Sequence, residues 1–154
     1  MMSLCCDVLK SLAGKTLATA ESCTGGMIGQ LLTAVPGASA VYKGGIISYW
    51  SAVKQDLLGV DPLVLRENGP VSAPVAAAMA TGVRKALTAD IAVSVTGLAG
   101  PDADEFGRPV GTVFVGYADE QNEIAKEFHF SGDREAVRCQ AAEAALQLIL
   151  ANCE

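Results

Sequence analysis

The stretch Thr16–Val35, TLATAESCTGGMIGQLLTAV, carries in order the patterns of a strand, a tight turn and a helix. Thr16–Ala20 holds small, apolar and β-branched residues, which is typical of a buried strand. In Thr24–Val35 the apolar side chains recur at helical spacing, and Thr24 stands where it can cap the helix by accepting a backbone N–H. The sequence therefore predicts a strand-turn-helix unit with the seven residues AESCTGG (Ala20–Gly26) at its turn.

The rest of the chain alternates between strand and helix patterns. In chain order we expect a strand at Val41–Tyr49, a helix at Ser51–Leu58, at most a helical turn at Pro62–Glu67, a helix capped by Ser72, strands at Ile91–Val95, Val110–Tyr117 and Glu123–Phe130, and a helix from Asp133. The last two strands are joined by a short polar turn, which predicts antiparallel pairing. This order predicts an α/β fold: one domain over residues 1–154, a layered α/β/α sandwich with a mixed sheet.

Composition narrows the class of protein. The net charge is −6, and the 11 basic residues are scattered, which argues against a nucleic-acid-binding surface. No apolar run approaches the roughly 20 residues that cross a bilayer, and the N-terminus lacks the pattern of a secretory signal. We therefore expect a cytoplasmic protein with neither nucleic acid nor membrane as a partner. The mean hydropathy of +0.34 favours a buried subunit interface, and we expect a homo-oligomer.

The turn AESCTGG has two interpretations. The N-terminus of a helix presents unpaired N–H groups and suits an anion or a developing oxyanion, and Gly25 and Gly26 would let a ligand approach the backbone. Equally, the segment is a capped turn whose glycines only permit tight packing. The motif alone leaves both interpretations open.

Two nucleophiles stand side by side in this turn. A thiol nucleophile at Cys23 would need an imidazole partner, and the only histidine, His129, lies in a predicted strand as an exposed or half-exposed residue. The five cysteines have no CxxC spacing, so we expect reduced thiols and no zinc site. A serine can instead be activated by a desolvated lysine, and Tyr49 and Lys54 follow five residues apart. Spacing alone favours a strand-end tyrosine and a solvated lysine there.

A second glycine-rich loop, Thr96–Pro101 (TGLAGP), follows the predicted strand Ile91–Val95. Two such loops at strand ends can form opposite walls of one pocket. The acidic segment Asp102–Glu105 lacks the pattern of a calcium loop and is expected to be a solvated turn. Arg134 and Arg138 share a helix face and could clamp a phosphate or carboxylate, or be ordinary surface charge.

Taken together, these blocks resemble the CinA C-terminal domain family. They occur in the same order, from about Lys15 to Leu150, as AESCTGG, GGIISYWSAVKQDLLGV, GPVSAPVA, VSVTGLAGPD, PVGTVFVG and FHFSGDREAVR. The resemblance implies hydrolysis of the carboxamide of nicotinamide mononucleotide, a small-molecule nucleotide, to nicotinate mononucleotide and ammonia in pyridine-nucleotide salvage. It implies no metal and no organic cofactor.

Carried over to this chain, the resemblance implies that Ser22 is the nucleophile, that Lys54 accepts its proton, and that Tyr49 orients or relays that proton. Substrate binding is expected from the two glycine-rich loops and the last helix, at Thr24, Gly25, Gly26, Thr96, Gly97, Ala99, Gly100, Arg134 and Arg138. Backbone N–H groups around Thr24–Gly26 would hold either the oxyanion or the substrate phosphate.

The chain departs from the family pattern at several positions. The family often reads Ser-Asn-Glu-Ala between the tyrosine and the lysine, where this chain has Trp50-Ser51-Ala52-Val53, and Ala73 replaces a usual acidic residue. Two alternatives therefore stand beside the amidohydrolase. One is a weakly active or inactive member that binds a nucleotide as a regulator, and the other is an oligomeric structural domain.

Overall fold

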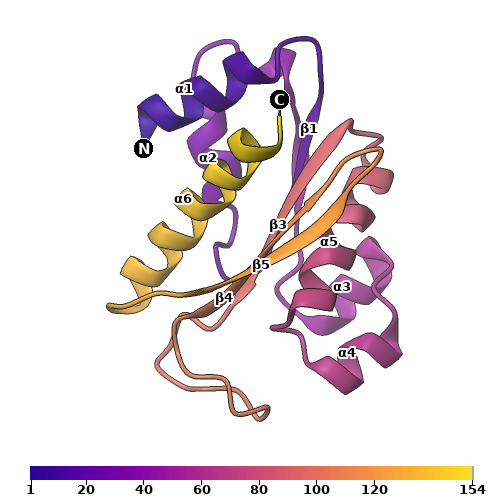
Figure 1. Ribbon diagram of the computed structural model, residues 1–154, viewed down its shortest axis with the longest axis vertical. Helices are drawn as coiled ribbons and strands as arrows, with labels where there is room; N and C mark the ends of the chain where they lie inside the picture. Colours follow the sequence, from indigo (N-terminus) through magenta and orange to yellow (C-terminus); the bar gives the residue numbers. More distant parts are fainter. Residues whose placement is uncertain (154) are drawn as a thin grey trace.

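A five-stranded sheet lies between two layers of helices in the computed structural model, which describes residues 1–153 (Figure 1). The strands are β1 (Leu17–Glu21), β2 (Tyr42–Ile47), β3 (Ile91–Gly97), β4 (Thr112–Ala118) and β5 (Glu123–His129). They lie in the order β2-β1-β3-β4-β5. Strands β2, β1 and β3 run parallel, whereas β3, β4 and β5 pair antiparallel. The predicted α/β class with a mixed sheet is confirmed.

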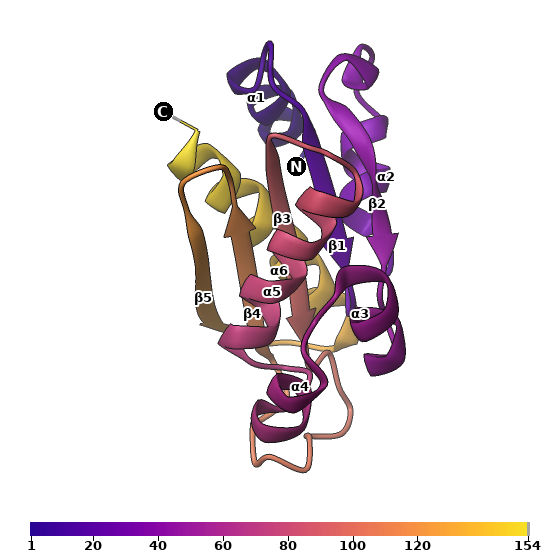
Figure 2. The same ribbon diagram turned by 90° about the vertical axis from the view of Figure 1, so that its right-hand side faces the viewer.

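Helices cover both faces of this sheet (Figure 2). One layer contains α1 (Met2–Ser11), α2 (Met27–Thr33) and α6 (Arg134–Asn152), and the other contains α3 (Ser51–Leu58), α4 (Pro62–Asn68) and α5 (Ala73–Ala86). A short 3-10 helix, η1 (Ala38–Ala40), connects α2 to β2. Because both faces are covered, all five residues of β1 are buried.

Alternation along β1 divides the core between the two layers. Leu17 packs in the cluster formed with α1, α2 and α6, whereas Ala18 and Ala20 pack in the cluster formed with α3, α4 and α5. Successive side chains of a strand point to opposite faces, so odd-numbered residues face one layer and even-numbered residues the other. This alternation decides the direction of the residues that follow β1.

Two features of the first helical layer differ from the sequence prediction. Helix α1 was not predicted, although its buried residues Cys5, Val8 and Leu9 have helical spacing. Helix α2 begins at Met27, later than expected, and its N-cap is Gly26 with a φ of 105°. The left-handed backbone at this position favours glycine, and a glycine has no side chain with which to cap the helix.

The second helical layer also corrects two predictions. Pro62–Asn68 forms a full helix, because Asp61 caps it by accepting the Leu63 N–H at 2.8 Å and proline suits its first turn. Ser72 stands at the N-cap of α5, but its hydroxyl donates to the Gly69 carbonyl at 2.9 Å instead of capping the helix.

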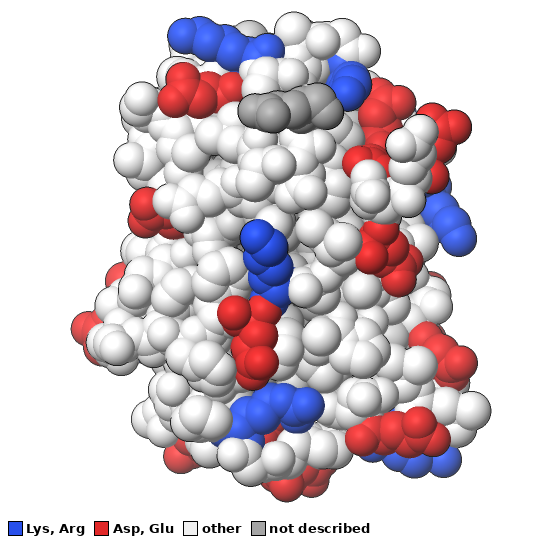
Figure 3. Space-filling model, viewed as in Figure 1, with Lys and Arg blue, Asp and Glu red and all other residues white. Residues whose placement is uncertain are grey.

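Charges on the surface are dispersed. On the face drawn in Figure 3, basic side chains stand singly among acidic ones and do not gather into a patch. Within residues 1–153, every helix is too short or too polar to cross a bilayer.

Candidate active site

A cavity of about 210 Å³ opens where β1 and β3 end, at the carboxyl edge of the parallel strands. Crevices at this edge are the usual ligand sites of open α/β sheets. The cavity walls come from both glycine-rich loops, from α3 and from the start of α6. The lining residues are Ser22, Cys23, Tyr49, Ser51, Lys54, Pro70, Val71, Thr96, Gly97, Leu98, Ala99, Gly100, Asp102 and Arg134.

Ser22 follows the last residue of β1, and its N–H still donates to the Val95 carbonyl of β3 at 3.0 Å. Cys23, the next residue, is 5% exposed and packs in the core cluster of α1, α2 and α6. Burial raises the pKa of its thiol to about 11. The two candidate nucleophiles therefore differ in environment: Cys23 is a packed neutral thiol, whereas the Ser22 hydroxyl meets a residue of the opposite layer.

That residue is Lys54, on α3. Its side chain is 1% exposed, and its Nζ donates to Ser22 Oγ at 3.0 Å. Nζ also donates to the carbonyls of Ser48 and Tyr49, at 2.5 and 3.3 Å. No carboxylate within residues 1–153 forms an ion pair with it. Burial lowers the pKa of Lys54 to about 8, so its neutral form is accessible near physiological pH.

The hydrogen bonds of Lys54 match the needs of a base. A charged ammonium has three donors, and three acceptors surround it. When the amine is neutral, two N–H groups remain for the two carbonyls. Its lone pair is then left for the Ser22 hydroxyl, which becomes the donor.

Tyr49 contributes its backbone, and not its hydroxyl, to this arrangement. The side chain is 56% exposed at the rim of the cavity, and its hydroxyl accepts from Arg134 at 3.2 Å. The structure shows no hydrogen bond from that hydroxyl to Ser22 or Lys54 within residues 1–153. A direct proton relay through Tyr49, as expected from the sequence, has no support in this geometry.

The two arginines of α6 do not act together as a clamp, which was one of the two interpretations of their spacing. Arg134 lines the cavity and donates to the carbonyl of Gly100 as well as to Tyr49. Arg138 donates instead to the carbonyls of Cys23 and Thr24, at 3.0 and 3.2 Å. Its remaining nitrogen pairs with Glu135 at 2.9 Å, so Arg138 holds the turn and is not free for a ligand.

Internal acceptors occupy most N–H groups of the turn that were expected to bind an anion. The Gly25 N–H donates to the Ser22 carbonyl at 3.0 Å, and the Gly26 N–H donates to the Glu21 carboxylate at 3.2 Å. Within residues 1–153, the N–H groups of Cys23 and Thr24 have no acceptor. Thr24 itself is fully buried, and it lies outside the cavity lining. Cys23 is in the cavity lining, whereas Thr24, Gly25 and Gly26 are not, so the N–H of Cys23 is the candidate donor to an oxyanion at Ser22.

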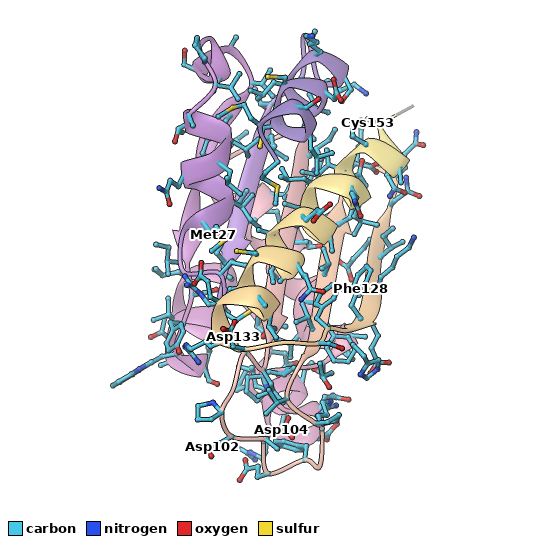
Figure 4. The ribbon with its side chains drawn as sticks, turned by 90° about the vertical axis from the view of Figure 1, so that its left-hand side faces the viewer. Met27, Asp102, Asp104, Phe128, Asp133 and Cys153 are labelled. Atoms are coloured by element: carbon cyan, nitrogen blue, oxygen red, sulfur yellow. The ribbon has the colours of Figure 1, made fainter. Side chains whose placement is uncertain are left out.

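The second glycine-rich loop forms the opposite wall, as expected, with Thr96, Gly97, Ala99 and Gly100 all in the lining. The Thr96 hydroxyl donates to the Pro70 carbonyl at 2.8 Å, which fixes the wall from the side of α5. Figure 4 shows the continuation of this loop, with Asp102 and Asp104, at the same end of the sheet as Asp133 at the start of α6.

The model of the CinA C-terminal domain family matches residues 2–153. The chain belongs to this family. It is 50% identical over 127 residues to a CinA-like protein of Geobacter sp. (strain M21), covering 82% of this chain and 31% of that protein. It is 58% identical over 115 residues to a CinA-like protein of Synechococcus sp. (strain CC9311), covering 73% of this chain and 27% of that protein. The chain spans about a third of the length of these curated relatives.

Solved structures of the CinA superfamily have the same fold. Competence damage-inducible protein A from Klebsiella pneumoniae superposes with a TM-score of 0.95 at 33% identity, covering 99% of this chain and 98% of that one. A competence/damage inducible protein from Agrobacterium tumefaciens gives 0.93 at 34% identity, covering 97% and 93%. The resemblance inferred from the ordered blocks is therefore confirmed.

The positions where this CinA-family chain departs from the expected pattern differ in their relation to the cavity. Ser51 lines it, whereas Ala52 is exposed on α3 outside the lining. Ala73 packs against the small cluster around Phe114 beneath α5. Trp50 and Val53 also lie outside the lining, so of the departing positions only Ser51 lines the cavity.

Two further groups of residues were considered from the sequence, metal ligands and the single histidine. Within residues 1–153, no three His, Cys, Asp or Glu side chains gather as metal ligands. His129 is exposed on β5, as predicted, and its Nε2 lies 3.3 Å from a carboxylate oxygen of Glu127. Sequence reasoning missed two acidic residues: Asp102 in the lining and Glu21 beneath the turn. For Glu21 the signal was available, because the residue before Ser22 must face the α2 layer if Ser22 faces α3.

Proposed function

We propose that this CinA-family chain is an amidohydrolase that converts nicotinamide mononucleotide to nicotinate mononucleotide and ammonia. The proposal combines the activity that family resemblance implies with the chemistry of the cavity. The observation that carries it is the hydrogen bond between buried Lys54 Nζ and Ser22 Oγ, 3.0 Å long, at the wall of a cavity. A neutral lysine beside a serine hydroxyl is a base-nucleophile pair that needs no histidine.

In the first half-reaction the Ser22 hydroxyl attacks the carboxamide carbon, and Lys54 accepts the hydroxyl proton. The tetrahedral oxyanion would be stabilised by backbone N–H groups, among which that of Cys23 is the candidate because this residue lines the cavity. The protonated Lys54 then gives its proton to the leaving nitrogen. The C–N bond breaks, ammonia departs, and an ester between Ser22 and the nicotinate acyl group remains.

In the second half-reaction a water molecule attacks this ester. Lys54, neutral again, accepts a proton from the water and returns it to Ser22 Oγ as the C–O bond breaks. The products are the starting enzyme and the carboxylic acid, which loses its proton to solvent to give the carboxylate, so protons and electrons balance without a redox partner.

The substrate phosphate would lie at the rim, near Arg134. Arg134 is exposed, lines the cavity and is the arginine of the pair that is not committed to the turn. Phosphate at the α2 N-terminus is disfavoured, because the Glu21 carboxylate already accepts the N–H groups there.

The test is ammonia release from nicotinamide mononucleotide by the wild type and by Ser22→Ala. We expect the substitution to lower kcat by about 10³-fold or more, as for other activated serines, without change in thermal stability. Ser39→Ala, on the exposed surface of η1, is the matched control and should keep full activity.

Two outcomes would contradict the proposal. Equal turnover by Ser22→Ala and wild type would remove Ser22 as the nucleophile. Stabilisation of the wild type by nicotinamide mononucleotide without any ammonia release would favour a nucleotide-binding regulator instead.

A further inference from the structure

Glu21 is a buried carboxylate whose role the proposed reaction leaves open. It is the last residue of β1 and is 2% exposed. Its Oε1 accepts the N–H groups of Gly26 and Ile28, at 3.2 and 2.9 Å, and its Oε2 accepts that of Gly29 at 3.1 Å. Within residues 1–153, no lysine, arginine or histidine nitrogen forms an ion pair with it. Backbone donors alone compensate its charge.

These donors are the ones that α2 cannot satisfy internally. The first N–H groups of a helix have no acceptor within the helix, and they carry the positive end of its dipole. Helix α2 has no acidic residue in its own first turn and no side-chain cap. Glu21 supplies the missing acceptor from the preceding strand. A buried carboxylate is costly without such bonds, so the charge and the helix end stabilise each other.

The bonds of Glu21 also close a loop around Ser22. The chain leaves β1 at Glu21, passes through Ser22 and returns to the same carboxylate at Gly26. On the outside of this loop, Arg138 from α6 donates to the carbonyls of Cys23 and Thr24. One anion thus holds N–H groups of the turn, and one cation holds its carbonyls.

We propose that Glu21 is a positioning residue that fixes the orientation of Ser22 toward Lys54, with Arg138 holding the same turn from outside. This inference rests on the proposed function of Ser22. Glu21 does not touch the substrate: it acts by holding the backbone from which Ser22 Oγ and the N–H of Cys23 are presented. A misplacement of about 1 Å at a reacting atom can lower a rate by about 10²-fold, which sets the size of the expected effect.

Glu21→Gln is the most conservative test, because it keeps the shape of the side chain and removes the charge. One carboxylate oxygen becomes an NH₂ group, which cannot accept an N–H from α2. We expect kcat for nicotinamide mononucleotide to fall about 10²-fold while KM changes less than about threefold, because substrate contacts are intact. Arg138→Met should give the same split between kcat and KM. Glu143→Gln, on the exposed face of α6, is the matched control.

Glu21→Ala allows chemical rescue. The substitution removes the carboxylate that accepts the α2 N–H groups, and formate is a free carboxylate that can replace it. Added formate should therefore raise the turnover of Glu21→Ala at least about tenfold. Formate should have no effect on the wild type or on Ser22→Ala. If the role of Glu21 were purely structural, Glu21→Ala would lose thermal stability, and added formate would not restore its turnover.

Amide hydrogen exchange separates this inference from the proposed function, because it needs no turnover. In Glu21→Ala the N–H groups of Gly26, Ile28 and Gly29 should exchange at least about tenfold faster, with formate restoring protection, while those of β3 stay unchanged. If exchange changes in this way but the wild type shows no amidase activity, Glu21 holds the turn as inferred, and the proposed reaction is wrong.

Three results would overturn the inference. One is unchanged exchange in the turn of Glu21→Ala. Another is a raised KM with normal kcat in Glu21→Gln or Arg138→Met, which would mean direct substrate binding. The last is failure of Glu21→Gln to fold, which would assign the carboxylate to stability alone.

Discussion

Lys54 Nζ lies 3.0 Å from Ser22 Oγ, although the two residues are 32 positions apart in the sequence. The sheet order produces this contact, because β2 lies beside β1 and the chain leaving β2 enters α3 directly above the end of β1. Among residues 1–153, the partners of this buried lysine are carbonyl and hydroxyl oxygens alone. Its charge state therefore controls both the proposed reaction and the stability of the fold.

The first prediction concerns the pH dependence of the reaction. Lys54 must be neutral to accept the Ser22 proton, and burial lowers its pKa to about 8. We expect kcat/KM for nicotinamide mononucleotide to rise with pH through an apparent pKa of about 8, falling about tenfold for each pH unit below it. Lys54→Met should lower turnover by about 10²- to 10⁴-fold and remove this limb. A profile that falls as the lysine deprotonates would contradict a basic role.

The second prediction concerns stability in the absence of substrate. The unfolded lysine keeps its proton up to about pH 10.5, whereas the folded one loses it near pH 8, so the unfolded chain binds more protons between these values. The free energy of unfolding therefore gains a contribution from Lys54 as the pH rises through this window. The gain approaches about 3–4 kcal/mol well above pH 10.5, because the pKa falls from 10.5 to about 8 and each pH unit contributes about 1.4 kcal/mol.

Lys54→Met removes the titrating group, so it should be more stable than the wild type at about pH 7, and this advantage should shrink by about 3 kcal/mol by about pH 10.5. Urea unfolding of both proteins at the two pH values measures the change. Lys126→Met, at an exposed position on β5, is the control: its free energy of unfolding should differ from that of the wild type by the same small amount at both pH values. A constant difference for Lys54→Met would mean that Lys54 is already neutral, or fully solvated, at the lower pH.

Local patterns predict the strand-turn-helix unit and the β4–β5 hairpin, because each depends on residues close together in the chain. The pairing of Ser22 with Lys54 was implied by the resemblance to the CinA family, whereas spacing alone favoured a solvated lysine. Its geometry depends on the parallel pairing of β1 with β2, which local patterns do not specify. Helix α1 was missed although the spacing of its buried residues is helical.

Alternation along β1 predicts the layer that Glu21 faces, but the contacts of Glu21 with α2 and of Arg138 with the turn could not be predicted from local patterns. Two glycines at the start of a helix predict free N–H groups only if no side chain accepts hydrogen bonds from them. Here the Glu21 carboxylate, at the end of β1, accepts those of Gly26 and Ile28. Arg134 and Arg138 share a helix face, but the way α6 packs over the turn brings only Arg138 to the Cys23 and Thr24 carbonyls. Tertiary packing separated two residues that spacing had grouped.

The third prediction tests which residue meets the substrate phosphate. Arg134→Gln removes the rim cation, so we expect KM for nicotinamide mononucleotide to rise about tenfold or more with kcat little changed. Nicotinamide riboside lacks the phosphate, and its kcat/KM should be the same for wild type and Arg134→Gln. If kcat/KM falls equally for both substrates, Arg134 does not bind the phosphate and instead stabilises the cavity rim through its hydrogen bonds to Tyr49 and Gly100.

The fourth prediction tests the position of α3 through a residue outside the cavity. Gly82 lies inside α5 with an ordinary helical backbone, where Gly→Ala usually stabilises a helix by about 1 kcal/mol. Here a Cβ would overlap the backbone carbonyl of Leu58, the last residue of α3, and a backbone oxygen cannot rotate away. The clash outweighs propensity, so we expect Gly82→Ala to lower the free energy of unfolding by about 1–3 kcal/mol.

Because Lys54 is on α3, one turn before Leu58, displacement of this helix should also move Nζ away from Ser22. Turnover of Gly82→Ala should therefore fall about tenfold or more under conditions where the protein is fully folded. Urea unfolding and ammonia release measure the two effects, and Ala86→Ser at the exposed end of α5 is the control. A stabilised and fully active Gly82→Ala would show that α3 and α5 do not approach as closely as described, and the position of Lys54 would then need another support.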